Sequence, residues 1–411
     1  MSVKKILKRL RFIPYRKRDI VEMCLQNEPS DIDKQQFKKL CHMLSSIFHF
    51  EFYQVTESMK NAYASVNPDS DTRDIGLAEK STNIEFVDLL GGLLEKANYE
   101  RISEVELSHA MSEESMFKIR LHVDFDDFSE VLLFCRGETL RKETVSRFLG
   151  LFPKEIEFIN YDRVVVYLRF KDDFVPEKGL EAYFTPGSTV LKLFQNVPKA
   201  DLEMLFPNTR VRMRTLDKLL IGIPAAISGG IVITTKLGAT LVLIGSLLGF
   251  WLGLSSQPVE INTTVILALF AGLAAFGGYL WKQFSNFKNR KLKFMQTLTQ
   301  NLYFKNLDNN AGVFHRLADD AEEEECKEAI LAYYFLLSSQ HGLTKVQLDN
   351  NIEAWFEQKW QCKVNFEIDD ALNKLLTLGI ITKNDNGYQA LPIDEAIKIL
   401  DQRWDNYFQP F

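Results

Sequence analysis

The chain has 411 residues and a net charge of −6, with acidic residues outnumbering basic ones. This length predicts two or three domains, and the charge excludes a general electrostatic attraction to nucleic acid, so no nucleic-acid partner is expected. The five cysteines are scattered without a CxxC pair, a pattern typical of a reducing compartment.

Residues 1–20 are predicted to form a basic amphipathic N-terminus. The first 18 residues carry eight basic side chains and no acid, and four apolar residues share one helical face before Pro14, namely Val3, Ile6, Leu7 and Leu10. Such a helix can lie on an anionic lipid surface. A helix packed on its own domain and a mitochondrial presequence are the alternatives.

Residues 21–215 are predicted to form an α+β domain in the cytoplasm. Helical patterns cover residues 30–64, 84–97 and 103–111, and alternating or β-branched runs follow at residues 116–123, 131–136, 163–170 and 190–195. Helices followed by a mainly antiparallel sheet are typical of the α+β class.

His122, Asp124 and Asp126 alternate in the sequence and are predicted to lie on one face of a strand. Three such side chains in a row suggest a metal site. A solvated strand face that ends in an acidic turn explains the same residues, and we prefer this interpretation.

The middle of the chain is an apolar block, residues 219–281. Residues 219–254 carry no charge except Lys236, and as one straight helix they would be about 54 Å long, too long for a hydrocarbon layer of about 30 Å. We therefore expect a break at Lys236, a re-entrant or interfacial segment at residues 219–235, and transmembrane spans at residues 237–254 and 263–281.

Basic residues flank this block on both sides, whereas the linker at residues 255–262 has no Lys or Arg. Positive flanks stay on the cytoplasmic side. The sequence therefore predicts a multi-pass protein of the cell inner (plasma) membrane with both termini in the cytoplasm. Three spans, or a mitochondrial membrane if the source is eukaryotic, are the alternatives.

Small residues repeat on both predicted spans. Gly245, Gly249 and Gly253 recur at every fourth position on the first span, and Ala271 and Ala275 do so on the second. This spacing allows close helix packing, within the hairpin or in an oligomer. Four residues are expected at the membrane interface: Lys236, Trp251, Tyr279 and Trp281.

Residues 282–340 are predicted to be a helical segment with an acidic helix at residues 318–337. His315 and Asp319 are one helical turn apart and close to further acids, a spacing that could hold a metal. A solvated acidic patch explains the same residues and is preferred.

Residues 341–411 are predicted to form a winged-helix-like module. Helical patterns at residues 345–360 and 367–378 precede Asn386-Gly387, a hairpin turn between two short strands. The module is acidic, which favours a protein contact or a structural role over DNA binding.

Five stretches carry a family resemblance: FIPYRKRDI (12–20), LHVDFDDF (121–128), NVPKADLEMLFPNTRVRM (196–213), NLYFKNLDNNAGVFHRL (301–317) and EECKEAILAYYFLL (324–337). Together they resemble an uncharacterised membrane protein family that includes transmembrane protein 143. The resemblance implies a domain of unknown function with transmembrane helices, and it implies no catalytic residues.

The sequence as a whole thus predicts an α+β membrane protein: an N-terminal α+β domain, a transmembrane helical hairpin, and a mostly helical C-terminal domain with a winged-helix-like end. The favoured function is a membrane-anchored adaptor or scaffold, with the lipid bilayer and a protein or a second copy as partners. A metal-dependent enzyme and an oligomeric transporter or channel are the alternatives. No cofactor is expected, no phosphate loop or nucleophile elbow is present, and we expect the two cytoplasmic parts to touch.

Overall fold

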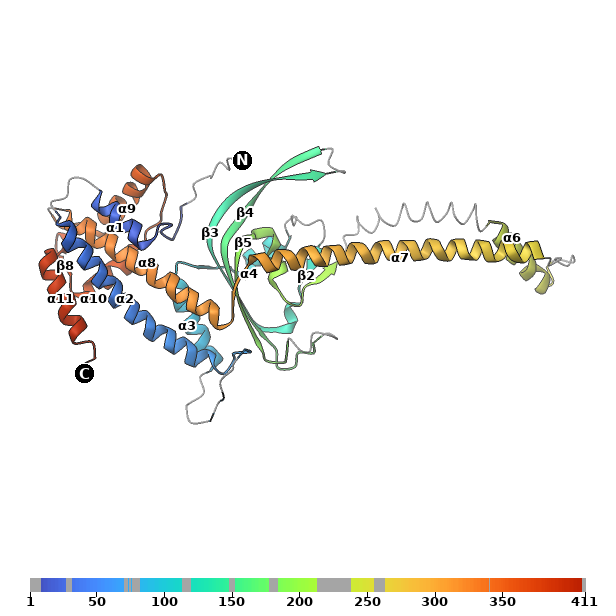
Figure 1. Ribbon diagram of the computed structural model, residues 1–411, viewed down its shortest axis with the longest axis horizontal. Helices are drawn as coiled ribbons and strands as arrows, with labels where there is room; N and C mark the ends of the chain where they lie inside the picture. The colour runs from blue at the N-terminus through green and yellow to red at the C-terminus, as the bar shows by residue number, and fades with distance from the viewer. Residues whose placement is uncertain are drawn as a thin grey trace. The chain divides into compact units, whose positions relative to one another are not determined.

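The computed structural model describes residues 9–26, 32–69, 73, 75, 82–112, 120–147, 152–176, 184–212, 238–254, 263–339 and 341–408 (Figure 1). The chain divides into two compact units. Unit 1 comprises Met1–Glu114, Asp124–Leu205 and Lys305–Phe411, and unit 2 comprises Ser115–Val123 and Phe206–Phe304. Segments from before and after the apolar block therefore fold together, which confirms that these two parts touch.

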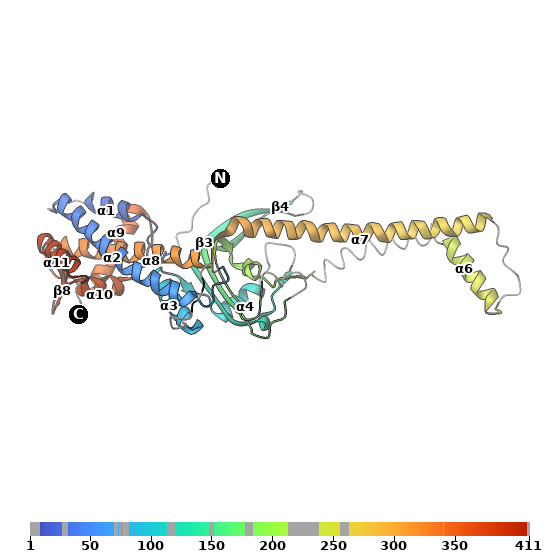
Figure 2. The same cartoon turned by 60° about the horizontal axis from the view of Figure 1, so that its bottom comes forward.

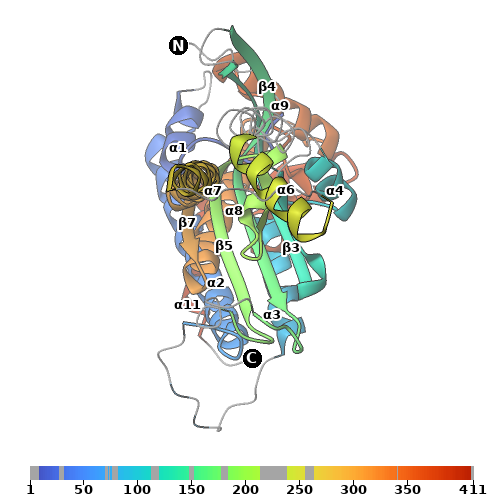
Figure 3. The ribbon, with the colours of Figure 1, turned by 90° about the vertical axis from the view of Figure 1, so that its right-hand side faces the viewer.

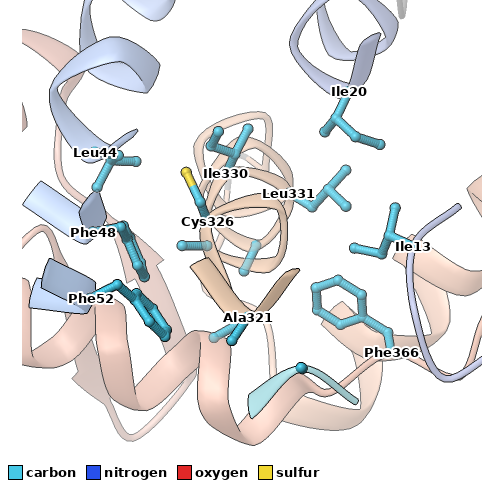
Figure 4. Close-up of a cluster of buried hydrophobic side chains, with 14 of the residues drawn as sticks. Ile13, Ile20, Leu44, Phe48, Phe52, Ala321, Cys326, Ile330, Leu331 and Phe366 are labelled. Carbon is cyan, nitrogen blue, oxygen red and sulfur yellow. The ribbon is translucent and has the colours of Figure 1, made fainter. Parts of the chain in front are cut away.

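Helix α8 (Ala311–Leu337) is the centre of unit 1. Five helices pack against it: α1 (Lys17–Leu25), α2 (Lys34–Tyr63), α3 (Asn83–Lys96), α9 (Lys345–Trp360) and α10 (Ile368–Leu378). Figure 4 shows Phe48 and Phe52 of α2 beside Ala321 and Cys326 of α8. Apolar residues are buried around the circumference of α8, as in a helix enclosed by its neighbours.

The helices predicted at residues 30–64, 84–97 and 103–111 are confirmed as α2, α3 and α4 (Glu104–Ser112). Side-chain caps explain where two of them begin. Asp33 accepts hydrogen bonds from the backbone N–H groups of Gln35 and Gln36 at the start of α2, and Thr82 accepts one from Glu85 at the start of α3.

Unit 1 also contains a five-stranded antiparallel sheet in the order β1-β3-β4-β5-β7. Its strands are β1 (Glu100–Arg101), β3 (Phe128–Arg147), β4 (Phe152–Phe170), β5 (Thr189–Pro198) and β7 (Asn306–Asn309). Figure 3 shows β5, β4 and β3 next to one another. The predicted strands 131–136, 163–170 and 190–195 are confirmed, but β3 and β4 are much longer than predicted.

The sheet is covered on both faces. Leu132, Val165 and Tyr167 point into the core formed by α2, α3 and α8. On the other face lie α4 and the 3-10 helix η2 (Lys199–Leu205), which contact each other. Figures 1 and 2 both show α3 and α8 on one side of β3 and α4 on the other.

The end of the chain adds α9, α10, the hairpin β8–β9 (Ile381–Asn384 and Gly387–Ala390) and α11 (Ile393–Asp405). The hairpin predicted at Asn386-Gly387 is confirmed. Gly387 has a φ of +117°, and a Cβ there would clash with the backbone of Leu343, which bridges to β9. Only glycine fits this position. Helix α11 was not predicted, although two acids in its first turn, Asp394 and Glu395, and the helical spacing of its buried residues mark it.

Unit 2 contains a two-stranded antiparallel sheet and two helices among its described residues. Strand β2 (Arg120–His122) pairs with β6 (Arg210–Arg212). Helix α6 spans Gly238–Trp251, and α7 spans Thr263–Lys305.

The predicted transmembrane hairpin is wrong. Helix α6 has 14 residues, about 21 Å at 1.5 Å per residue, which is shorter than a hydrocarbon layer of about 30 Å. The second predicted span coincides with the start of α7, which continues through the basic residues after Trp281 as the helical pattern predicted there indicates. No helix in the described part of the chain is long and apolar enough to cross a membrane.

Two further predictions depend on that hairpin and are corrected with it. The fold is mixed α/β with an antiparallel sheet, not an α+β membrane protein. The predicted multi-pass location in the plasma membrane, or alternatively in a mitochondrial membrane, is also wrong because it required spanning helices. The segment at 219–235 and Lys236 lie outside the described residues.

Candidate functional site

The acidic residues of α8 form a network of buried and half-buried charges, here called the α8 network. The sequence favoured a solvated acidic patch at the start of a helix. In the structure α8 begins earlier, at Ala311, so these acids lie in its middle. Six carboxylates have partners from other segments or from α8 itself: Asp320, Glu322, Glu323, Glu324, Glu325 and Glu328.

Glu324 and Lys327 are a buried ion pair. Their Oε1 and Nζ atoms are 2.9 Å apart, and both side chains are only 4% exposed. Glu324 also accepts a hydrogen bond from the N–H of Ile13 at 3.0 Å, and Lys327 donates to the carbonyls of Ile13 at 2.8 Å and Tyr15 at 3.2 Å. The pair therefore holds the segment at residues 9–16, here called the N-terminal strap.

The N-terminal strap is also held by the link between α9 and α10. The N–H of Leu10 donates to Lys363 O at 2.8 Å, and the N–H of Asn365 donates to Leu10 O at 2.7 Å. Residues 1–8 lie outside the described part, and the described part of the predicted N-terminal helix is this extended strap until α1 begins at Lys17.

Arg136 of β3 joins the sheet to the α8 network. It donates to Asp320 at 3.1 Å and to the carbonyl of Ala97 at 3.2 Å. Its guanidinium also lies over the rings of Phe12 and Tyr99, 5.0 and 4.9 Å from their centroids.

Glu328 is a buried carboxyl of the α8 network, and its pKa is perturbed. Burial raises the pKa of Glu328 well above its ordinary range. Its Oε1 accepts a hydrogen bond from Asn98 Nδ2 at 3.0 Å. A carboxyl in this environment is favoured in its neutral form.

The more exposed carboxylates pair with basic side chains from four helices. Glu322 lies 3.6 Å from Lys17 and 2.9 Å from Nδ1 of His49, and Glu325 lies 3.3 Å from Lys96 and 3.1 Å from Lys374. The network therefore ties α1, α2, α3 and α10 to α8. Because its groups satisfy one another, we interpret it as structural.

The two metal hypotheses gain no support from geometry. His315 and Asp319 are both exposed on α8; partial burial lowers the pKa of His315, and burial with neighbouring carboxylates raises that of Asp319. Within the described residues, no three His, Cys, Asp or Glu side chains are grouped so that they could hold a metal. Metal binding here stays a prediction.

His122, Asp124 and Asp126 do not share one strand face. Strand β2 ends at His122, and Asp124 is instead the N-cap of the 3-10 helix η1 (Phe125–Asp127). The side chain of Asp124 accepts a hydrogen bond from the N–H of Asp126 at 3.3 Å. Capping a helix is an ordinary structural use of an aspartate.

The residues predicted for helix packing and the membrane interface lie in α6 and α7. Trp251 is 88% exposed and Trp281 is 71% exposed. No described atom lies within 4 Å of the position that a Cβ would take at the three glycines of the repeat. These glycines are Gly245, Gly249 and Gly253; the repeat on α7 comprises Ala271 and Ala275, and Tyr279 follows it on the same helix.

A groove between α4 and β3 is the larger of two described cavities in unit 1, about 660 Å³ in volume, and we call it the α4–β3 groove. Val105 is 76% exposed and Phe125 is 40% exposed at its mouth. Thirteen residues of β1, α4, η1 and β3 line it: Arg101, Ile102, Glu104, Val105, Leu107, Ser108, Met111, Phe125, Phe128, Ser129, Glu130, Val131 and Leu133.

The wall formed by α4 is fixed at its N-terminus and on its opposite face. The N–H of Ser103 donates to Glu106 Oε2 at 2.9 Å, and the N–H of Glu106 donates to Ser103 Oγ at 3.2 Å, a capping box. On the face of α4 that does not line the groove, Ala110 is buried, and α4 contacts η2. The groove is therefore held open by anchored elements.

The other described cavity has a volume of about 50 Å³ and lies beside the N-terminal strap. Three arginines line it, and each already has a carboxylate partner: Arg9 with Glu353, Arg11 with Glu367, and Arg136 with Asp320. This arrangement leaves little capacity to bind an anion.

Residues 161–312 match the model of a family described as a protein of unknown function, DUF3754. The chain contains a DUF3754 domain. The DUF3754 domain includes β5, β7 and most of β4 from unit 1 and β6, α6 and α7 from unit 2. Its description mentions neither transmembrane protein 143 nor a membrane. No solved structure matches the chain. The α4–β3 groove lies outside the DUF3754 domain.

Proposed function

We propose that this protein is a scaffold that binds a segment of a partner polypeptide in the α4–β3 groove. The observation that carries the proposal is an apolar groove of about 660 Å³ between two anchored elements, with exposed Val105 and Phe125 at its mouth. Binding sites are commonly grooves of about 300–1,000 Å³ lined by apolar side chains with a few polar groups.

The α8 network supports a scaffold less directly. Its carboxylates were predicted to form a solvated patch, but they are engaged inside unit 1. We therefore assign recognition of the partner polypeptide to the apolar α4–β3 groove. The rest of unit 1 then serves to hold α4 and β3 in place.

We also propose that the two folded units are homologous to the family that includes transmembrane protein 143. Its support is that two motifs quoted for that resemblance meet in the structure. The N–H of Ile13 in FIPYRKRDI is bonded to Glu324 in EECKEAILAYYFLL.

The test uses the immobilised full chain and a display library of random 12-residue peptides. Enriched peptides are synthesised, and their dissociation constants are measured by fluorescence anisotropy. We expect Val105→Glu to weaken binding by about tenfold or more, because a charge replaces an apolar contact of the groove.

Val346→Glu is the matched control. Val105 and Val346 are both the second residue of a helix and are 76% and 66% exposed, respectively. Peptides that bind Val346→Glu as tightly as the wild type but bind Val105→Glu poorly support the groove. No enriched peptide, or equal binding by both variants, would overturn the proposal.

A further inference from the structure

The outer edge of β3 is only partly used for strand pairing. Strand β1 has two residues, which pair with Cys135 and Phe134. One more hydrogen bond follows, from the N–H of Ile102 to Leu133 O at 2.8 Å. The chain then turns away into α4, and in the described sheet no strand pairs with this edge at Val131.

Val131 presents its backbone to the groove. In an antiparallel strand the N–H and C=O of alternate residues point to the same edge. Leu133 O points to the outer edge because Ile102 bonds to it, so the N–H and C=O of Val131 point there too. Val131 and Leu133 both line the groove.

The side chains beside that edge alternate between two environments. Leu132 points into the core on the α8 side, whereas Val131 and Leu133 lie on the α4 side. A strand added next to β3 would follow the same alternation. Every second side chain would contact apolar groove residues such as Met111 and Phe125.

The same alternation places the carboxylate of Glu130 on the α8 side, where Asn83 Nδ2 of α3 donates to it at 3.0 Å. The other two charged residues that line the groove, Arg101 and Glu104, have opposite charges. The groove therefore selects an added strand by its backbone and its apolar side chains rather than by charge.

We infer that the partner segment binds as an added strand on the outer edge of β3, with alternating apolar residues. This inference rests on the proposed function, because it specifies how the same groove binds a polypeptide. It commits to β-strand addition, which combines backbone hydrogen bonds with side-chain pockets at every second position. The added strand would continue the pairing with β3 that β1 begins.

The deciding experiment is an N-methyl scan of the tightest 12-residue peptide from the library, with the wild-type full chain. N-methylation removes one backbone donor at a time. Loss of binding at every second position, about tenfold at each, is expected for a strand. A flat profile, or losses spaced three or four residues apart as on a helix, would overturn the inference.

Val131→Pro tests the same edge from the protein side. Proline removes the N–H that points away from β4. The hydrogen bonds between β3 and β4 do not use this N–H, so a sheet tolerates proline at such an edge position. Val131→Thr, which keeps the N–H and nearly the same shape, is the matched control. We expect at least about tenfold weaker binding for the proline variant than for the threonine variant; equal affinities contradict strand addition.

The two proposals fail in different ways. If the library yields no peptide that depends on Val105, the proposed function itself is wrong. If such a peptide exists but the scan has no period of two, the groove binds a polypeptide and only strand addition is wrong.

Discussion

Helix α8 is rich in acids and yet buried, whereas α7 begins apolar and yet has exposed side chains. Residues 319–328 of α8 include seven acids, yet this stretch lies in the core of unit 1, where Glu324, Lys327 and Glu328 are buried. Helix α7 begins with an apolar run and carries no acid, yet its described side chains include Phe270 at 64% exposed and Trp281 at 71% exposed. Polarity alone therefore misplaces both helices.

The difference lies in the partners. A buried charge is tolerated when an opposite charge and hydrogen bonds satisfy it, and α8 receives such partners from the strap and four neighbouring helices. An apolar side chain is buried only if another surface covers it. Four substitutions test whether partners decide the burial of these two helices.

The largest effect is expected for Lys327→Met. It leaves the Glu324 carboxylate buried without its cation and removes two hydrogen bonds to the strap. We expect a loss of about 3–5 kcal/mol in the free energy of unfolding, measured by urea denaturation. Lys398→Met, at an exposed position of α11, should change it by no more than about 0.5 kcal/mol. Equal effects would show that the α8 network contributes no stability.

A smaller effect is expected for Arg136→Lys. Lysine keeps the charge but loses the planar fork that bonds both Asp320 and Ala97 O and lies over two rings. We expect a loss of about 2 kcal/mol. Arg101→Lys, at an exposed arginine of the neighbouring strand β1, is the control. The role of Arg136 is refuted by equal denaturation midpoints for the two variants.

Glu328→Gln should change how stability depends on pH. Because burial raises the pKa of Glu328 in the folded state, its neutral form is favoured there, and stability is lost as pH rises from the unfolded pKa of about 4.3 toward the folded pKa. Glutamine keeps an acceptor for Asn98 and does not titrate. Its stability relative to the wild type should increase over this range, in chemical denaturation at a series of pH values.

Two features bear on that experiment. Nearby carboxylates of Glu324, Glu367 and Asp370 also raise the pKa of Glu328, so ionic strength must be held constant across the series. Glu95→Gln, at an exposed position at the end of α3, is the control and should show no such trend. A flat difference between Glu328→Gln and the wild type contradicts a buried neutral carboxyl.

The smallest effect is expected for Phe270→Ala on α7. Its exposed ring should contribute no more than about 0.5 kcal/mol to the free energy of unfolding. Phe314→Ala on α8 removes a ring that is 1% exposed and should cost about 3–5 kcal/mol. A cost above about 1.5 kcal/mol for Phe270→Ala would mean that another surface covers this part of α7.

Local patterns predicted the local structure well. The 3.6-residue periodicity gave α2 and α3, and the turn at Asn386-Gly387 gave the last hairpin. Strand β7 was missed because its four residues continue a helical pattern, and they form a strand only by pairing with β5 more than a hundred residues earlier.

The candidate site was not predictable in the same way. The acidic run was visible in the sequence, but its partners Ile13, Lys17 and Lys374 are distant in the chain. The α4–β3 groove exists because β1 stops after two residues. The capping pattern of Ser103 and Glu106 marks the start of α4, but two residues are too few to show the period of a strand, so β1 itself was missed. One signal was present: Val105 is an apolar residue among the acids at the start of a short helix.

The N-terminal strap has a consequence for synthesis in the cell. Arg11 is bonded to Glu367, which follows it by 356 residues. At about 5–20 residues per second, the ribosome needs roughly 20 to 70 s to make that partner. During most of this time the strap and the first helices exist without α8 (Ala311–Leu337), the surface that buries their apolar residues. Nascent chains should therefore depend on chaperones until translation is nearly complete.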